Sequence, residues 1–209
     1  MPAKDRPPEP WASFLAALDA AVGTPVAIQC LGGFVVEHAY RIQRDKPTED
    51  IDFLSAIDIA HSAPINIEFL AGKGTAFHRR HKMYVQYVGV STPPCDYQKR
   101  LVAMYPQAQW KNLRLFGLEA HDLALSKIER NNRRDSQDVR GLAQAGLIDP
   151  DVLESRYHQE VRPYLLSKFE WHDGTLKRWL EAIRKIRADM QSAANQEDDI
   201  STEKDIDKA

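Results

Sequence analysis

The sequence has few of the features that mark membrane or secreted proteins. Its 209 residues include only two cysteines, Cys30 and Cys95, which lie far apart and form no metal-ligand pattern. So few thiols indicate a reducing compartment. No apolar run approaches the roughly 20 residues that span a bilayer, and the first ten residues lack the apolar stretch of a signal peptide. These absences predict a cytoplasmic protein without membrane contact.

An excess of charge of one sign is also missing. The 28 basic and 30 acidic side chains leave a formal net charge of −2. Residues 192–209 contain six acids and two lysines, a net charge of −4, so the rest of the chain carries a net charge of +2. This balance excludes a general basic coat for nucleic acid. The basic residues cluster instead at 78–82, 130–134 and 184–187, and such clusters become functional only if they converge on a pocket.

Length and composition fit one globular unit with a helical appendage. An apolar content of 43% is ordinary for a globular protein of this size. Four prolines among residues 1–10 predict a flexible lead-in. We expect an α/β (α+β) core with a mixed sheet over 11–118 and a helical region packed on it over 119–191. The acid-rich segment 192–209, which has no aromatic residue, is expected to be a disordered tail.

Hydrophobic periodicity predicts the order of the elements. In the α/β half, helices are expected at about 10–22, 32–42, 64–71 and 97–104, and strands at 26–31, 50–55, 84–90 and 113–116. In the helical half, helices are expected at about 119–131, 136–145, 150–168 with a break near Pro163, and 174–190.

Two carboxylates stand on one face of a predicted strand. Successive side chains of a strand point to opposite faces, so Asp50 and Asp52 project together while Ile51 and Phe53 face the core. Two like charges this close repel each other, and a cation relieves the repulsion. Mg²⁺ is the expected partner, because it prefers carboxylate oxygens together with water and substrate phosphates.

Gly32 and Gly33 fit the same chemistry. They lie between a predicted strand and a predicted helix, where unobstructed backbone N–H groups can receive a phosphate. Either motif alone is more often structural, as a tight turn or an exposed strand face. Together, in this order and with sixteen residues between them, they predict a site for an NTP with Mg²⁺.

The order of these motifs resembles the signature of the polymerase-β-like nucleotidyltransferase superfamily, a Gly-Gly or Gly-Ser followed by Asp-x-Asp. Residues 47–53 (Pro-Thr-Glu-Asp-Ile-Asp-Phe) are similar to the branch of AbiEii-type toxins from bacterial toxin–antitoxin and phage-defence systems. The resemblance covers about residues 26–147. It implies that Gly32 and Gly33 hold the nucleotide and that Asp50 and Asp52 hold the metal ion.

A second block, residues 121–130, resembles the same branch, in which an Asp-x-x-x-x-Lys element follows the catalytic strands. Here the pair is Asp122 and Lys127. On one helix Lys127, Arg130 and Arg134 are spaced i, i+3 and i+7 and form a cationic stripe opposite the apolar face. We expect an exposed Lys127 to take part in catalysis and contact the β/γ-phosphates, with Arg130 assisting and Asp122 as an accessory residue. An exposed helix with structural i,i+4 pairs is the alternative.

The third carboxylate that active members of the superfamily usually carry on a later strand is missing. It often acts as the base that takes the acceptor's proton. The candidate strand has Gln86 at the expected position, and an amide cannot act as a base near neutral pH. Glu68 and Asp96 are possible substitutes, although neither falls on a predicted strand.

Three functions stay open. The first is Mg²⁺-dependent transfer of a nucleotidyl group from an NTP; the resemblance implies a toxin or defence component with RNA, particularly tRNA, as acceptor and a cognate antitoxin protein as partner. The second, favoured by Gln86, is a non-catalytic nucleotide-binding module of the same fold. The third is a DNA-binding regulator in which helices 136–145 and 150–158 form a helix-turn-helix. The modest charge and the acids Asp149 and Asp151 count against the third.

Overall fold

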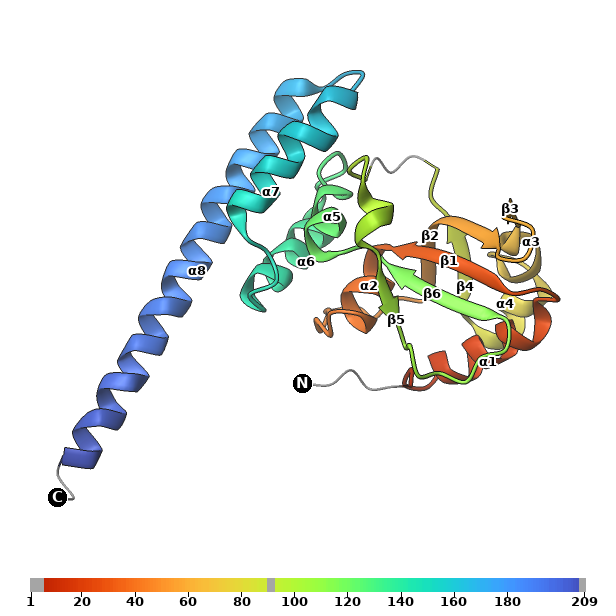
Figure 1. Ribbon diagram of the computed structural model, residues 1–209, viewed down its shortest axis with the longest axis horizontal. Coiled ribbons are helices and arrows are strands. Elements are labelled where there is room, and N and C mark those ends of the chain that lie inside the picture. Colours follow the sequence, from red (N-terminus) through yellow and green to blue (C-terminus); the bar gives the residue numbers. More distant parts are fainter. Residues whose placement is uncertain (1–5, 90–92, 207–209) are drawn as a thin grey trace.

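The computed structural model describes residues 6–89 and 93–206, with side chains described as far as residue 193. A six-stranded mixed sheet with helices forms the first half of the chain, and helices form the second half (Figure 1). The predicted fold class is therefore confirmed. Within the described ranges no helix combines the length and the hydropathy required to cross a bilayer.

The sheet brings three segments of the predicted site together. Strands run in the order β3-β2-β1-β6-β5, and β4 also pairs with β2. β2 lies antiparallel to β1 and parallel to β4, while β6 lies parallel to β1. The start of β2 is thus flanked by the end of β1 and by β4. The strands are β1 (Val26–Leu31), β2 (Asp50–Asp58), β3 (Ala63–Pro64), β4 (Tyr84–Tyr87), β5 (Val102–Met104) and β6 (Leu113–Gly117).

Aromatic side chains join the helices that pack on the sheet. The Trp11 ring lies 4.8 Å from that of Phe34, and the Phe14 ring lies 5.4 Å from that of Phe77. Trp11, Phe14 and Phe34 are buried in the hydrophobic core. These contacts hold α1 against α2 and α4. The helices of this half are α1 (Trp11–Ala21), α2 (Gly32–His38), α3 (Ile67–Ala71) and α4 (Ala76–His81).

Helices α5 and α6 lie between the sheet and the pair formed by α7 and α8 (Figure 1). Local signals start two of them. Asn132 and Asp135 form a reciprocal capping box at the start of α6, and Asp149 caps α7, which begins with Pro150. The elements are α5 (Ala120–Leu125), α6 (Arg133–Gln144), α7 (Pro150–Arg156), the π turn η2 (Tyr157–Val161), the 3₁₀ turn η3 (Arg162–Tyr164) and α8 (Phe169–Ile206).

Two predicted helices of the α/β half are wrong in extent or type. The helix expected over 32–42 ends at His38. The helix expected over 97–104 is a 3₁₀ turn, η1 (Tyr97–Arg100), followed by β5. Strand β5 pairs with β6 at the edge of the sheet. This pairing satisfies its backbone groups through a partner that local periodicity does not reveal.

The helical half also differs from the prediction. The helix expected over 119–131 ends at Leu125, and Asn131 adopts a left-handed φ of 37° just before the α6 cap. Helix α8 continues to Ile206, so residues 192–206 are helical where we expected a disordered tail. No glycine or proline follows Gly174 to end that helix. Three segments of the predictions lie outside the described residues: 1–5 of the lead-in, Val90 of a strand and 207–209 of the tail.

Asp122 joins two helices of the helical half to the 3₁₀ turn η1 of the α/β half. It is fully buried on α5 and accepts hydrogen bonds from Arg100 Nε at 2.8 Å and Nη2 at 3.1 Å. Arg156 Nη1 on α7 donates to the same carboxylate at 2.9 Å. Arg100 also donates to Glu160 at 2.7 Å. Asp122 therefore holds η1 and α7 against α5.

We expect Asp122→Ala to lower the free energy of unfolding by about 3 kcal/mol, because it removes the fully buried carboxylate that Arg100 and Arg156 share and leaves each with one half-buried glutamate. Urea denaturation monitored by circular dichroism measures this change. The matched control is Asp189→Ala on the exposed part of α8, which should stay within about 0.5 kcal/mol of the parent protein. Equal stability of the two variants would show that the Asp122 cluster does not hold the segments together.

Candidate functional site

Asp50 and Asp52 project from the start of β2 as the alternation predicts. Ile51 and Phe53 lie in the core, and the two carboxylates are half-buried. Asp50 is oriented by two hydroxyl groups: Thr48 Oγ1 donates to it at 2.7 Å and Tyr84 Oη at 3.0 Å. The first carboxylate is therefore fixed by its neighbours.

Asp52 has a different environment. Among the described residues no side chain donates a hydrogen bond to its carboxylate or forms an ion pair with it within 4 Å. Burial, and next the charge of Asp50, raise the pKa of Asp52 to about 6, while Lys127 and Arg130 lower it. An ionised carboxylate that lacks a direct partner beside a second carboxylate is a position suited to a cation.

The two glycines allow charged side chains to pack closely against the β1–α2 junction. Gly32 has a φ of 73°, which L side chains rarely adopt, and a Cβ at this position would overlap the Asp52 carboxylate. A Cβ on Gly33 would overlap the guanidinium of Arg44. A carboxylate and a cation thus occupy the space beside the β1–α2 junction that side chains would otherwise fill.

An ion network around two buried acids of helix α6 supports the site. Asp138 accepts hydrogen bonds from Arg44 Nε at 2.8 Å and Lys127 Nζ at 2.9 Å. Asp135 accepts from Arg130 Nε at 2.8 Å and Nη2 at 2.7 Å, and Lys127 Nζ lies 3.8 Å from it. The three cations therefore have acidic partners on α6, and the negative charge of the β2 pair is not directly neutralised.

The predicted exposure of Lys127 is wrong. Only 4% of the residue is accessible, and it sits in a run of turns after α5, so the continuous cationic helix stripe does not exist. Lys127 points inward because Asp138 on α6 offers it a buried partner. Lys127, Arg130 and Arg134 nevertheless line one cavity, because the turn after α5 and the start of α6 bring them there.

A polar cavity opens over the carboxylate pair. Its volume is about 420 Å³. Basic side chains outnumber acids along its walls, and the two carboxylates stand among them. The basic residues of the walls are Lys46, Lys73 and Arg134 and the three cations of the ion network; the acids are Glu49, Asp50 and Asp52. The cavity suits an anion that carries or attracts a metal ion.

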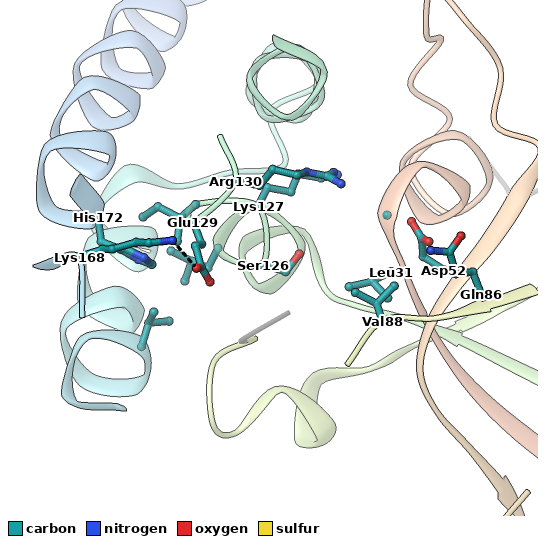
Figure 2. A pocket seen from close by; sticks show the side chains of 14 residues that line it. Leu31, Asp52, Gln86, Val88, Ser126, Lys127, Glu129, Arg130, Lys168 and His172 are labelled. Carbon is teal, nitrogen blue, oxygen red and sulfur yellow. Dashed lines mark hydrogen bonds and ion pairs between the residues drawn. The ribbon is translucent and has the colours of Figure 1, made fainter. Parts of the chain in front are cut away.

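A second cavity meets the first at Asp52, Gln86, Lys127 and Arg130. It also measures about 420 Å³ and extends to helix α8. Its walls include five apolar side chains: Leu31, Val88, Leu125, Ile128 and Val161. Figure 2 shows Asp52 and Gln86 on one side of it, with Glu129, Lys168 and His172 on the other.

His172 is a site residue that the sequence did not reveal. Only 3% of it is accessible, and its Nδ1 has no hydrogen-bond partner among the described residues. Burial lowers the pKa of His172, so the imidazole is neutral near pH 7. Beside it Lys168 Nζ donates to Glu129 Oε1 at 3.1 Å. No local motif surrounds His172 in the sequence, because only the packing of α8 brings it to the cavity.

Gln86 lies beside Asp52 in the parallel pairing of β2 with β4. An amide thus stands next to the carboxylate pair. The proposed substitutes are elsewhere: Glu68 accepts a hydrogen bond from the Tyr87 backbone, and Asp96 pairs with Lys99. Neither these two acids nor Asp122 line the two cavities.

The mixed sheet, the Gly-Gly junction and the carboxylate pair on the next strand define a nucleotidyltransferase-like fold. Residues 32–187 match the model of a family described as a nucleotidyltransferase of unknown function (DUF6036), and the chain belongs to this family. No curated protein and no solved structure matches the chain. The family supports the superfamily resemblance, whereas the AbiEii-like branch stays a prediction.

We expect Lys127→Ala to lower the free energy of unfolding by about 3 kcal/mol, because it removes a buried cation from between two carboxylates. Arg44 and Arg130 still hold these acids, which keeps the loss at the low end for a buried pair. Lys46→Ala is the matched control, since its side chain is 66% exposed in the same cavity; it should change stability by less than about 0.5 kcal/mol. Chemical denaturation of both variants measures the change in stability. An unchanged denaturation midpoint for Lys127→Ala would contradict the buried position of Lys127 in the network.

Proposed function

We propose that this protein transfers a nucleotidyl group from an NTP to an acceptor hydroxyl in a Mg²⁺-dependent reaction. The observation that carries the proposal is the carboxylate pair of β2, in which Asp50 is oriented and Asp52 lacks a direct partner among the described side chains. The polar cavity over this pair supplies the cationic surroundings that a triphosphate requires.

Asp50 and Asp52 fit a magnesium ion by their chemistry. Both offer hard oxygen donors, and the cations nearby are held by Asp135 and Asp138. An ion bound there would supply the positive charge that activates an attacking oxygen and stabilises a leaving pyrophosphate. Thr48 and Tyr84 keep Asp50 in the orientation in which it receives the ion.

The cations of the polar cavity hold the phosphates in this proposal. Lys127 and Arg130 stand where the two cavities meet, and the ion network fixes both of them before a ligand arrives. Such preorganisation lets them stabilise the charge that develops on the phosphates without first reorganising. Gly32 and Gly33 leave the backbone at the β1–α2 junction open to the nucleotide.

The second cavity supports a place for the nucleoside. Apolar walls suit the faces of a base, and polar groups at one end suit its edges. A neutral His172 has one ring nitrogen that can donate a hydrogen bond there and one that can accept one. The ion pair of Lys168 with Glu129 adds a further donor and acceptor.

The finer assignment is part of the proposal and rests on resemblance. Residues 47–53 and 121–130 are similar to AbiEii-type toxins, which supports a toxin or defence role with RNA, particularly tRNA, as acceptor. A cognate antitoxin protein is the partner that such a role requires.

A non-catalytic nucleotide-binding module is the second candidate. The position of Gln86 beside Asp52 favours it, because this amide cannot take the acceptor's proton. Both candidates require binding of Mg²⁺ and nucleotide, and only transfer separates them.

We expect Gly32→Ala to weaken the binding of Mg²⁺-ATP by at least about tenfold, or 1.4 kcal/mol, because its Cβ displaces the Asp52 carboxylate. Gly146→Ala is the matched control: its φ of 72° is nearly the same, and a Cβ there meets nothing within 4 Å. Both variants should lose roughly 1–2 kcal/mol of stability from backbone strain. Isothermal titration calorimetry should separate them, and equal nucleotide affinity of the two would refute the placement of the metal beside Gly32.

We expect the purified protein with Mg²⁺ to incorporate labelled nucleotide into an RNA fraction, and Asp52→Asn to abolish incorporation while the domain stays folded. The four NTPs are tested separately with total RNA at low ionic strength, since electrostatic RNA binding weakens with salt. Gel electrophoresis of the labelled RNA gives the readout.

The outcomes distinguish the two candidates. Label in RNA with the parent protein alone supports transfer. Calorimetric binding of nucleotide, without label in RNA or protein, favours the non-catalytic module. Equal nucleotide binding by Asp52→Asn and the parent protein would show that the carboxylate pair is not the site.

A further inference from the structure

A groove runs between residues 42–46 and helix α6. Its volume is about 500 Å³. At its base α6 approaches the opposite wall closely, since a Cβ on Gly141 would meet Ile42 Cγ2 at 2.5 Å. The groove is thus shaped by packing between two segments far apart in the sequence.

Three arginines of α6 line this groove without acidic partners. Arg133, Arg134 and Arg140 are exposed, and within the described part of the chain none of them forms an ion pair. Two exposed arginines elsewhere in the helical half have acidic partners: Arg162 pairs with Asp173, and Arg184 pairs with Asp151 and Glu154. Arg178 instead contacts Thr175 and the Trp171 ring. Three exposed arginines without an acidic partner among the described residues therefore gather along this one groove.

The acids of the groove do not cancel this charge. Asp138 is buried and already accepts hydrogen bonds from Arg44 and Lys127. Asp45 accepts from the Gln137 amide at 3.1 Å and is the other acid along the walls. The groove keeps a positive excess, although the chain as a whole has a net charge of −2.

The groove is continuous with the polar cavity over Asp50 and Asp52. Arg44, Lys46 and Arg134 line both. A ligand that follows the groove therefore arrives beside the carboxylate pair. Arg133 and Arg140 extend the cationic surface by about 10 Å along the axis of α6, which is longer than one phosphate group.

We propose that this groove binds the phosphodiester backbone of a polynucleotide and guides its end to the carboxylate pair. Arginine matches phosphate by its planar fork of donors, and guanidinium groups without acidic partners can direct that fork at a ligand. The proposal rests on the proposed function in one respect: the bound polynucleotide is the acceptor of the nucleotidyl group. Binding itself requires no transfer.

The test measures the binding of a fluorescent single-stranded RNA oligonucleotide by anisotropy, without NTP, over a series of salt concentrations. Arg133→Gln/Arg140→Gln changes the two arginines that line the groove but not the polar cavity. We expect roughly tenfold weaker binding and a salt dependence of log K that is less steep by about 0.7 for each phosphate that the variant no longer neutralises. Calorimetry should show unchanged binding of Mg²⁺-ATP.

The matched control removes two positive charges elsewhere. Arg79→Gln/Arg80→Gln alters an exposed basic pair on α4 that lines neither the groove nor the polar cavity. This variant should bind RNA as the parent protein does. Equal weakening by both double variants would show a general charge effect and overturn the groove assignment.

The remaining outcomes are also decisive. Binding of single-stranded DNA as tight as that of RNA supports the proposal, because both carry the phosphodiester backbone, while tighter RNA binding supports it and narrows the ligand to RNA. Absence of RNA binding by the parent protein overturns the proposal. So does a competition experiment in which polyglutamate displaces the labelled RNA as effectively as unlabelled RNA does. Asp52→Asn should keep RNA binding, because Asp52 does not line the groove. RNA binding by a parent protein that transfers no nucleotide would count against the proposed function alone, whereas transfer without groove-dependent RNA binding would count against this inference alone.

Discussion

The ion network of helix α6 is the constraint on which the site depends. Asp138 is buried between Arg44 and Lys127, which come from the segment after α2 and the turn after α5. A buried carboxylate is tolerated only with such partners, so the three segments must come together. The same network places the cations beside Asp52 and brings α6 against residues 42–46. One electrostatic requirement thus positions the polar cavity and shapes the groove beside it.

The two carboxylates of β2 divide their roles through their surroundings. Asp50 is satisfied by two hydroxyl donors, whereas Asp52 lies against Gly32 without a direct donor among the described residues. The nearby cations already have acidic partners on α6. They lower the pKa of Asp52, but not enough to offset burial and the charge of Asp50. The carboxylate pair therefore suits a metal cation, while the cationic walls around it suit an anion. A metal–triphosphate complex carries both.

Transfer differs from binding alone in requiring a group that takes the proton of the acceptor hydroxyl. Gln86 stands beside Asp52, and the other acids considered as its substitutes lie away from both cavities. An enzyme of this fold must then pass the acceptor's proton to another group or to solvent. Asp52 lines the cavity that extends to His172, and the arginine groove of α6 joins the polar cavity over Asp52. Two approaches suit a reaction in which two ligands meet at one carboxylate pair.

The sequence by itself determined three features that depend on short-range interactions: the β2 face with Asp50 and Asp52, the Gly32–Gly33 junction and the start of α7 at Asp149-Pro150. Strand alternation, glycine backbone freedom and helix capping each act over a few residues. Tertiary structure alone decided that Lys127 is buried, that residues 102–104 form a strand, and that His172 and the α6 arginines meet cavities. Burial of a charge depends on partners such as Asp138 and Arg44, ninety-four residues apart. Edge pairing and cavity walls likewise arise from segments that meet only in the folded chain.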